Sequence, residues 1–413
     1  MPSRIRYMGN KHEVAPIVAR LVRRRSAERM FLDLFCGMCS VAGSIAHSGR
    51  TVVGNDVQSY AVLVAECLLA SPEMPPSQDR INGALRRSYL YNEHQLLERF
   101  GGDVEREHQV IAASDARGYR RLYDAWRHAA NDQVLANEVM CLSAAPTRGV
   151  PYRLATLCFA WGYFGLRQAI AIDSIRYAID RGRADGHLTS AEASWALVAL
   201  LQAASCAAAT TGHFAQYLRP STPEGLVRII RQRRRGIWSQ FLRELKELRP
   251  YGSAAWRTKN RILQSDALDV WGSLDEIGFR DGVVYADPPY SKDHYSRYYH
   301  VLETLTLYDY PNITGKGRYR SDRFVTPFSL KSRVHSAMDR LAAAAAARNC
   351  TLILSYPSNG LLNADCGIDP ETVLQEHFKT VIRQRPIKTN HSTLGARHGV
   401  ARNSVHELLW IAD

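Results

Sequence analysis

The chain has 413 residues and a formal net charge of +13, and 46% of its residues are hydrophobic, as in ordinary soluble globular proteins. No charged-then-apolar leader follows Met1, and no apolar run reaches about 18 residues without a charge, so we expect a soluble, cytoplasmic protein with no membrane span. The basic charge favours a polyanionic partner. However, arginine is spread along the whole chain, so composition alone explains the charge about as well.

The N-terminal residues alternate between strand and helix patterns. We expect, in chain order, an amphipathic helix at 12–25, a buried strand at 30–37, a helix at 41–49, a buried strand at 50–57 and a helix at 59–71. The first strand ends in a turn at Gly37, and the second ends at Asp56. This order predicts a parallel sheet with right-handed crossovers.

Residues 71–77 (SPEMPPS) are rich in residues that break helices and strands, and we expect a linker there. The alternation of strands and helices stops at this linker, and helical periodicity with few strand signals follows to about residue 250. Sheet-type patterns then resume: we expect a strand from about 260 that ends near Asp266, a buried strand from 282 that ends at Asp287, and strands at 350–360 and 404–413. We also expect helices at 300–309 and 332–349 and an exposed basic loop at 313–332. The sequence therefore predicts an α/β domain of residues 1–71 and 255–413, interrupted by a mostly helical insertion at 72–254.

The eight cysteines are scattered, mostly in apolar stretches where a thiol behaves as a small hydrophobic group. Cys36 and Cys39 form a C-x-x-C pair, but no second pair at zinc spacing follows. We therefore expect reduced thiols and no metal.

The tetrapeptide Asp287-Pro288-Pro289-Tyr290 follows an apolar strand and suits the methylation of an aromatic amine. The lone pair of such an amine is delocalised into the ring. A carboxylate can accept a hydrogen bond from one N–H of the amine, and a carbonyl that is held by rigid prolines can accept from the other. Together these two bonds would free the lone pair. Tyr290 can stack on a base that has left its duplex. The same tetrapeptide also occurs by chance as an ordinary strand-to-turn boundary.

The turn at 33–37 lies between a strand and a helix, where glycine lets the backbone approach a ligand closely. Asp56, at the end of the next strand, stands where acidic side chains bind ribose hydroxyls. A plain β–α connection explains the turn alone, but the pairing with an acid favours a nucleoside-bearing cofactor. A pyrophosphate cofactor is disfavoured because the full G-x-G-x-x-G set is absent.

Five motifs occur in the order typical of the alpha group of DNA adenine methyltransferases, which includes the bacterial and phage GATC methylases. Each of them resembles one motif of that family: RYMGNK (6–11) the N-terminal cofactor motif, FLDLFCG (31–37) motif I, GNDVQSY (54–60) motif II, LQSDAL (263–268) a third cofactor-side motif, and YADPPYS (285–291) the catalytic loop. The resemblance implies a Rossmann-like methyltransferase sheet. It also implies methyl transfer from S-adenosylmethionine to the 6-amino group of a flipped adenine in DNA.

The resemblance also implies roles for single residues. Catalysis would rest on Asp287, Pro288 and Tyr290, and the cofactor would contact Tyr7, Lys11, Asp33, Phe35, Gly37, Asp56, Asp266 and Asp287. Lys11 would bind the methionine carboxylate, Asp56 the ribose, and Asp266 would lie near the adenine of the cofactor. Lys11 as a solvated helix-start residue and Asp266 as a helix N-cap stay open as alternatives.

One position departs from the family pattern. Motif I usually has Gly-x-Gly, and Cys39 stands at the second glycine position. A side chain there would crowd the cofactor or force a different turn, which puts cofactor affinity in doubt more than identity.

In that family the segment between motif II and the catalytic half recognises DNA, so residues 72–254 are expected to contain the target-recognition domain. Within it, a cationic run beside Trp238 suits phosphate contacts, and a solvated helix face is an equal alternative; the run comprises Arg231, Arg233, Arg234 and Arg235. The implied partner is double-stranded DNA, with a cognate restriction nuclease or defence-system component as a further candidate.

Three alternative functions remain open. They are methylation of adenine in RNA, methylation of the exocyclic amine of cytosine, and DNA binding by a protein whose cofactor site has degenerated.

Overall fold

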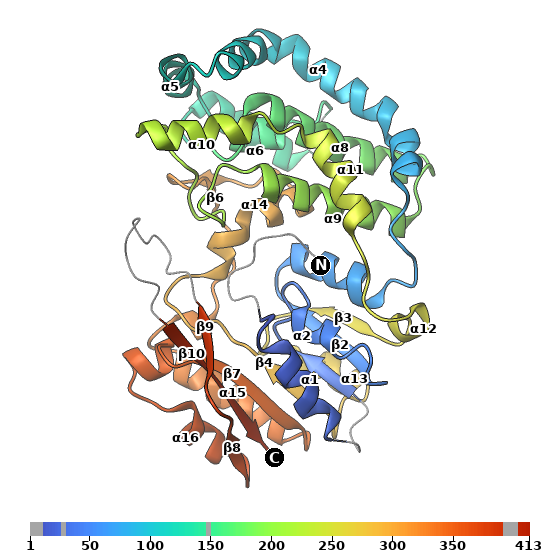
Figure 1. The fold of residues 1–413 in the computed structure, drawn as a ribbon, viewed down its shortest axis with the longest axis vertical. Coiled ribbons are helices and arrows are strands. Elements are labelled where there is room, and N and C mark those ends of the chain that lie inside the picture. Colours follow the sequence, from blue (N-terminus) through green and yellow to red (C-terminus); the bar gives the residue numbers. More distant parts are fainter. Residues whose placement is uncertain (1–10, 26–29, 146–149, 391–403) are drawn as a thin grey trace. The chain divides into compact units, whose positions relative to one another are not determined.

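The computed structural model describes residues 11–25, 30–145, 150–390 and 404–413 (Figure 1). The described residues form two compact units. The α/β unit takes them from Tyr7–Glu73, Pro250–Ser296 and Phe324–Asp413, and the helical unit from Met74–Arg249 and Arg297–Arg323. Each unit is described in turn.

The α/β unit is built on one sheet of eight strands. The strands are β1 (Met30–Asp33), β2 (Thr51–Asp56), β3 (Arg261–Gln264), β4 (Val283–Ala286), β7 (Thr351–Pro357), β8 (Val381–Arg383), β9 (Ile387–Asn390) and β10 (Ser404–Ala412). Their order is β3-β2-β1-β4-β7-β10-β8, with β9 paired to β10. The first five strands are parallel, and β10 is antiparallel to β7. Because parallel strands end at one edge, the residues that follow β1, β2, β3 and β4 lie near each other.

Helices cover the sheet of this unit. They are α1 (Ala15–Arg23), α2 (Ser40–Ser44), α3 (Ser59–Ala65), α12 (Ala254–Arg257), α13 (Trp271–Glu276), α15 (Val334–Ala346) and α16 (Pro370–Gln375), with short π-helices at Glu66–Ala70 and Leu361–Asp365 and a 3-10 turn at Pro327–Ser329. The apolar core joins strand residues such as Leu32, Val284 and Trp410 to α13 and α15, and these three side chains are fully buried. Burial of each contributes roughly 1.5–3 kcal/mol.

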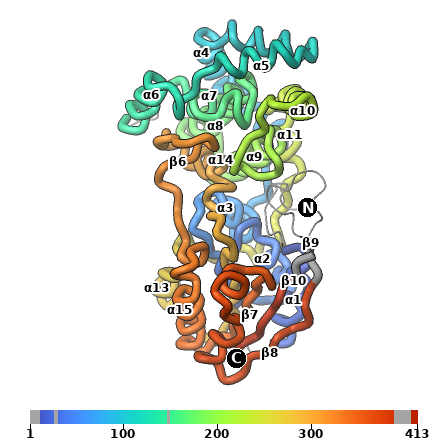
Figure 2. Tube along the Cα trace, turned by 90° about the vertical axis from the view of Figure 1, so that its left-hand side faces the viewer, coloured from blue at the N-terminus to red at the C-terminus, as the bar shows by residue number. Residues whose placement is uncertain are grey.

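The helical unit contains α4 (Gln78–Ala112), α5 (Ala116–Ala125), α6 (Gln133–Ala144), α7 (Leu154–Phe159), α8 (Leu166–Ala184), α9 (Ser190–Ala207), α10 (Pro223–Arg233) and α11 (Ile237–Glu247) (Figures 1 and 2). The helices begin where the sequence supplies caps. Ser77 accepts a hydrogen bond from the Arg80 amide, and Thr189 and Glu192 form a reciprocal capping box. Helix α8 is buried along most of its length and packs against α4 and α9.

Residues 297–323 return to the helical unit, where they are fixed by buried hydrogen bonds. Helix α14 (Tyr295–Leu307) begins in the α/β unit and continues here, followed by the hairpin β5 (Ile313–Thr314) and β6 (Tyr319–Arg320). The Tyr308 hydroxyl donates to Asp173, and Arg176 donates to the Leu305 carbonyl (3.2 Å).

The expectation of an exposed basic loop at 313–332 was therefore wrong. Arg318 and Arg320 are 1% and 5% exposed, because backbone carbonyls and the Asp309 and Asp322 carboxylates bind their guanidinium groups.

The predicted class, an α/β protein with a Rossmann-like, mostly parallel sheet, is confirmed. Two of the strands, β8 and β9, had no sequence signal of their own. None of the helices in the described ranges combines the length and apolar character that a bilayer crossing requires.

Candidate active site

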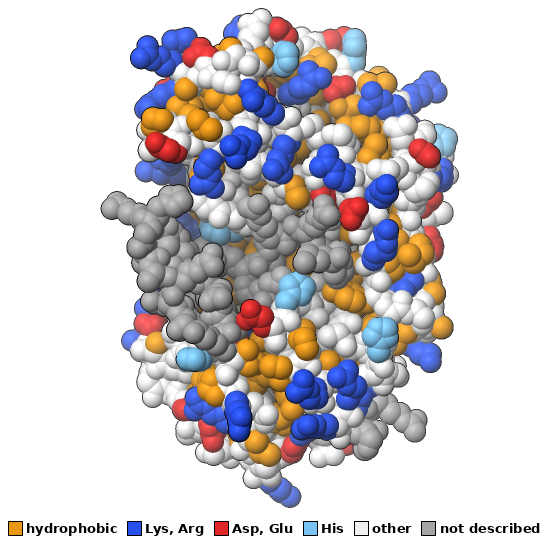
Figure 3. All heavy atoms as spheres, viewed as in Figure 1, with side chains coloured by type: hydrophobic (Ala, Val, Ile, Leu, Met, Phe, Trp, Pro, Cys, Tyr) orange, Lys and Arg blue, Asp and Glu red, His pale blue; other side chains and the backbone are white. Residues whose placement is uncertain are grey.

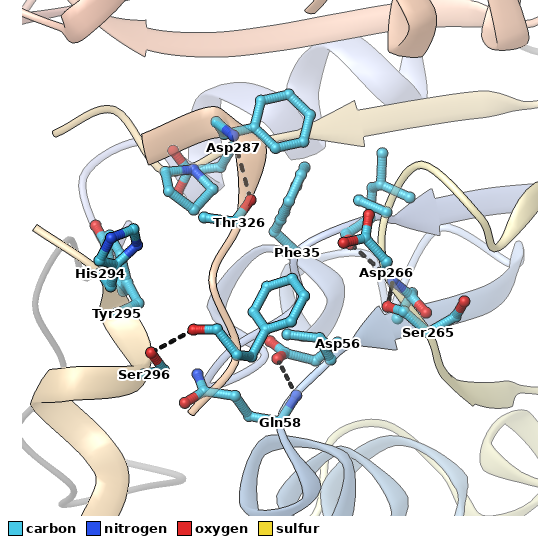
Figure 4. A pocket seen from close by; sticks show the side chains of 17 residues that line it. Phe35, Asp56, Gln58, Ser265, Asp266, Asp287, His294, Tyr295, Ser296 and Thr326 are labelled. Carbon is cyan, nitrogen blue, oxygen red and sulfur yellow. Dashed lines mark hydrogen bonds between the residues drawn. The ribbon is translucent and has the colours of Figure 1, made fainter. Parts of the chain in front are cut away.

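A cavity opens at the carboxyl edge of the parallel strands, and the space between its walls, including the part open to solvent, is about 770 Å³. Its walls come from the ends of β1, β2, β3 and β4 and from two later segments, and they comprise Leu34, Phe35, Asn55, Asp56, Val57, Gln58, Ser265, Asp266, Ala267, Asp287, Pro289, His294, Tyr295, Ser296, Phe324, Thr326 and Phe328. In the view of Figure 4 the Phe35 ring lies between Asp287 and Asp56. Phe35 packs edge-to-face on Phe328, with ring centroids 5.5 Å apart.

Asp56 is held by the backbone of two turns. One carboxylate oxygen accepts from the Gly37 amide (3.0 Å) and the other from the Gln58 amide (2.9 Å, Figure 4). Asp56 lines the larger cavity at the end of β2, and a carboxylate in this position can accept hydrogen bonds from ribose hydroxyls. Gly37 has φ 45°, a conformation that favours glycine, and its bond to Asp56 ties the two turns together.

A second, smaller cavity lies at the first turn, with about 310 Å³ of space between its walls including the part open to solvent. It is lined by Lys11, Asp33, Phe35, Cys36, Gly37, Met38, Ser40, Val41, Tyr285 and Asp287. Phe35 and Asp287 line both cavities, so the Asp287 carboxylate stands where the two spaces meet.

Asp33 is buried beside this second cavity. One of its oxygens accepts from the Ala42 amide (3.0 Å), and the other has no hydrogen-bond partner among the described residues. Burial, together with the nearby Asp287 and Asp56, raises the pKa of Asp33 to about 7, against the lowering effect of the Ala42 bond. A buried carboxylate with an open acceptor facing a cavity suits a cationic group such as an ammonium.

Lys11 joins two carboxylates inside the α/β unit. Its Nζ lies 3.0 Å from Asp287 Oδ1 and 2.7 Å from Glu407 Oε1, and all three side chains are less than one-fifth exposed. Burial alone would lower the pKa of Lys11, but Asp287 and Glu407 raise it above its usual value. Lys11 is therefore a buried cation, which excludes the alternative of a solvated helix-start residue.

Glu407 was missed by the sequence reasoning. It lies on β10, is 1% exposed, and also accepts from the Ser355 hydroxyl of β7. The available signal was a lone acid in the apolar run SVHELLWIAD, since a charged residue in a buried strand needs a buried partner.

The loop after β4 holds Asp287 to Tyr290 in place. Pro288 is buried, and the Tyr290 carbonyl accepts from the Leu361 amide (2.7 Å). The half-buried Tyr290 ring has Lys11 Nζ 5.9 Å from its centroid and contacts Tyr356 edge-to-face. Tyr290 lines neither of the two cavities described above.

Asp266 is not a helix N-cap, because α13 begins at Trp271 with Val270 as its N-cap. It lines the larger cavity beside Ser265 (Figure 4), while its Oδ1 accepts from the Leu268 amide (2.8 Å) and so caps the turn that leads to α13.

Cys39 occupies the second glycine position with φ 62° and is fully buried. It lines neither cavity, so its side chain does not crowd the space that motif I encloses. The turn keeps the left-handed conformation that glycine would adopt, and Cys39 carries the strain. Its hydrogen bond with Cys36, and burial, raise the pKa of the Cys36 thiol.

Tyr7, the remaining predicted cofactor residue, lies outside the described residues. Gln58, Thr326 and Phe328 line the larger cavity without having been predicted. Thr326 and Phe328 come from the segment expected to be a loop, where FVTPF was the missed aromatic signal.

The arginine run at the end of α10 divides by exposure. Arg233 is 7% exposed, and its guanidinium donates to the Tyr119 hydroxyl and the Gly162 and Tyr163 carbonyls. Its guanidinium is therefore not accessible to a DNA phosphate, contrary to the expectation that Arg233 contacts one. Arg231, Arg234 and Arg235 are exposed, although Arg234 and Arg235 also bind backbone carbonyls. On the face drawn in Figure 3, Lys and Arg side chains are spread out and do not gather into one patch.

Comparisons with known proteins cover different parts of the chain. Residues 7–131 match the model of the family described as D12 class N6 adenine-specific DNA methyltransferase. The chain is 29% identical to Type II methyltransferase M.FokI of Planomicrobium okeanokoites over 60% of this chain and 34% of that protein. It is 22% identical to Modification methylase LlaI of Lactococcus lactis subsp. lactis, over 82% and 44% respectively.

The chain thus spans less than half the length of these two relatives. In contrast, Type II methyltransferase M.CviAII of Paramecium bursaria Chlorella virus 1 is 23% identical over 99% of this chain and 98% of its own length. None of these names states a GATC target. By its matched region and its relatives, the chain is similar to adenine-specific DNA methyltransferases of the D12 class, which confirms the resemblance that the motifs predicted.

Proposed function

We propose that the protein is a site-specific DNA methyltransferase that transfers a methyl group from S-adenosylmethionine to the 6-amino group of an adenine flipped out of the duplex. The observation that carries this proposal is the position of Asp287, a carboxylate at the junction of two cavities, one suited to a nucleoside and one to an amino acid. The family match and the named methylases support the same activity.

The residues present fit S-adenosylmethionine. Asp56 offers acceptors for the ribose hydroxyls, and Phe35 and Asp266 flank the space for the adenine. The open oxygen of Asp33 suits the ammonium of the methionine part, and Lys11, with Glu407 and Asp287 on two of its donors, has a third donor for the carboxylate. When bound, the cofactor supplies an electrophilic methyl group.

Asp287 acts on the target amine. Its carboxylate accepts one N–H, which pulls the nitrogen toward the geometry in which its lone pair is free. Lys11 lies 3.0 Å from the same carboxylate and keeps it ionised and fixed in direction. Pro288 is buried and holds the adjacent backbone rigid, so the second N–H meets a preset carbonyl acceptor. Tyr290 follows on the same loop and supplies a stacking surface for the base.

The helical unit would then read the target sequence in double-stranded DNA, in accordance with the large insertion between motif II and the catalytic loop. Arg231 is exposed and forms no hydrogen bond or ion pair with the described residues, so it is the candidate for a phosphate contact. The relatives named as type II enzymes or modification methylases support a cognate restriction nuclease as the physiological counterpart.

A methyl-transfer assay tests the catalytic assignment. Wild-type protein, Asp287→Ala and Asp287→Asn are incubated with S-adenosylmethionine carrying a labelled methyl group and with unmethylated bacterial DNA. Loss of the carboxylate charge is expected to lower the rate about 100- to 1,000-fold in both variants, on the scale of removing one preorganised transition-state contact.

Asp293→Ala is the matched control, since this neighbouring acid lines neither cavity. Its rate is expected to equal that of the wild type, and circular dichroism checks that all variants fold. Full activity of Asp287→Ala would contradict the site assignment.

A further inference from the structure

A separate cavity of about 320 Å³ lies within the helical unit. Aromatic and cationic side chains dominate its wall, which comprises Tyr123, Asp124, Trp126, His128, Asn131, Trp161, Tyr217, Arg219, Lys316 and Arg318. Asp124 is the one carboxylate among these residues, and it pairs at the surface with Arg120 (3.8 Å). The volume is at the lower end of the range of small-ligand sites, which is roughly 300–1,000 Å³.

Arg318 is the unusual feature of this wall. It is 1% exposed, and none of the described carboxylates forms an ion pair with it. Its Nη1 donates to the Cys158 carbonyl (3.2 Å) and the Ala160 carbonyl, while its Nε has no partner among the described residues. Burying a guanidinium without an opposite charge is costly, so a cavity beside it is a site prepared for an anion.

The backbone around Arg318 is shaped to hold the guanidinium there. A Cβ at Gly162 would lie 2.9 Å from Arg318 Cζ, so only glycine leaves room for the group. The Tyr217 ring lies 4.9 Å from the same carbon and holds it by a cation–π contact. Arg318 itself has φ 55° and Trp161 has φ 59°, so two non-glycine residues carry backbone strain beside the cavity.

Three further polar atoms in the wall lack partners. Trp126 Nε1, Trp161 Nε1 and His128 Nδ1 are buried and form no hydrogen bond with the described residues. Burial, and then Arg318, lower the pKa of His128 to about 3, so the imidazole is neutral at physiological pH. The wall therefore combines indole N–H donors and a neutral imidazole with one buried cation.

The exposed rim adds Arg219 and Lys316, and the half-buried Tyr123 and Tyr217 present ring surface beside them. An anion fits the cations, and a flat heteroaromatic ring with its own polar edge fits the tyrosines and the unpaired N–H groups. A plain carboxylate or inorganic phosphate would use only the first of these features.

We propose that this cavity binds one nucleotide, with its phosphate at Arg318, Arg219 and Lys316 and its base against Tyr123 and Tyr217. The nucleotide comes either from solution or from a DNA strand. In the second case the inference rests on the proposed function and deepens it, because the helical unit would then hold a single unpaired nucleotide in addition to any contacts with duplex DNA.

Calorimetric titration of the full chain without S-adenosylmethionine tests this proposal with three probes: deoxyadenosine monophosphate, inorganic phosphate, and a short single-stranded oligonucleotide. The test variant is Arg219→Ala/Lys316→Ala, which changes only exposed side chains. Loss of two charged hydrogen-bond donors is expected to weaken nucleotide binding at least about tenfold. The matched control is Arg87→Ala/Arg183→Ala, which removes the same charge from exposed positions of the helical unit and is expected to bind as the wild type.

Binding of the mononucleotide supports a ligand from solution, and binding of the oligonucleotide alone supports a nucleotide of a DNA strand. The proposal is overturned if neither probe binds, if phosphate binds as tightly as the nucleotide, or if both double variants lose affinity equally. The readout does not need methyl transfer, so loss of binding in the test variant supports this site even if the methyl-transfer assay fails.

Discussion

At the scale of single residues, Asp33 makes cofactor binding depend on pH. Its folded-state pKa is raised from 3.8 to about 7 by burial, so the carboxyl is partly protonated near neutrality. A cofactor ammonium favours the ionised form, and S-adenosylmethionine affinity is therefore expected to fall as pH drops below about 7, by up to about tenfold per pH unit. Calorimetry between pH 6 and pH 8 measures this slope.

Asp33→Asn is the control for this prediction. This variant is expected to bind the cofactor more weakly at pH 8, with an affinity that no longer depends on pH. An unchanged pH dependence would assign the titration to another group.

The free energy of unfolding depends on the ionisation of Asp33 in the opposite direction to cofactor affinity. Because the folded pKa is raised, stability from neutral Asp33 is present below pH 3.8 and is lost as pH rises through about 7. The variant should therefore gain unfolding free energy above pH 7.

At the scale of elements, the turn before α2 keeps a left-handed backbone conformation although a cysteine stands at the second glycine position of motif I. Cys39 adopts φ 62° but lines neither cavity. Cys39→Gly is expected to change S-adenosylmethionine affinity less than about twofold. It should shift the free energy of unfolding by no more than about 1 kcal/mol, because relief of left-handed strain opposes the lost side-chain burial and the entropy cost of glycine. Calorimetric and denaturant titrations measure the two quantities.

Gly37→Ala is the comparison within the same turn. Gly37 lines the smaller cavity at φ 45°, and a side chain there is strained and faces the cofactor, so affinity is expected to fall at least about tenfold. If Cys39→Gly instead raised affinity by a similar factor, the cysteine would be crowding the cofactor after all.

The elements of the sheet were predictable because their signals are local. Buried apolar runs that end in Gly37, Asp56 and Asp287 gave strand positions and a shared edge. Pairings between distant segments had no such signal. Glu407 meets Lys11 across 396 positions of sequence, and Arg318 becomes buried only because residues 297–323 pack on α7. The apolar periodicity of one segment carries no information about its contacts with a segment far away in the sequence.

At the scale of the whole molecule, the chain passes between its two units more often than the sequence indicated. The catalytic loop and α14 are adjacent in sequence, yet Asp287 lies in the α/β unit and most of α14 in the helical unit. Helix α14 is therefore one of the segments that join the two units, and it leads from the catalytic loop into the helical unit. The net charge of +13 is divided between exposed arginines and structural ones such as Arg233 and Arg318, so the charge overstates the surface available to DNA.

Mass spectrometry of nucleosides from DNA treated with the protein and S-adenosylmethionine distinguishes adenine methylation from its alternatives. We expect N6-methyldeoxyadenosine with the wild-type protein and none with Asp287→Ala. N4-methyldeoxycytidine, methylated RNA only, or no methylated nucleoside from a protein that binds the cofactor would contradict this expectation.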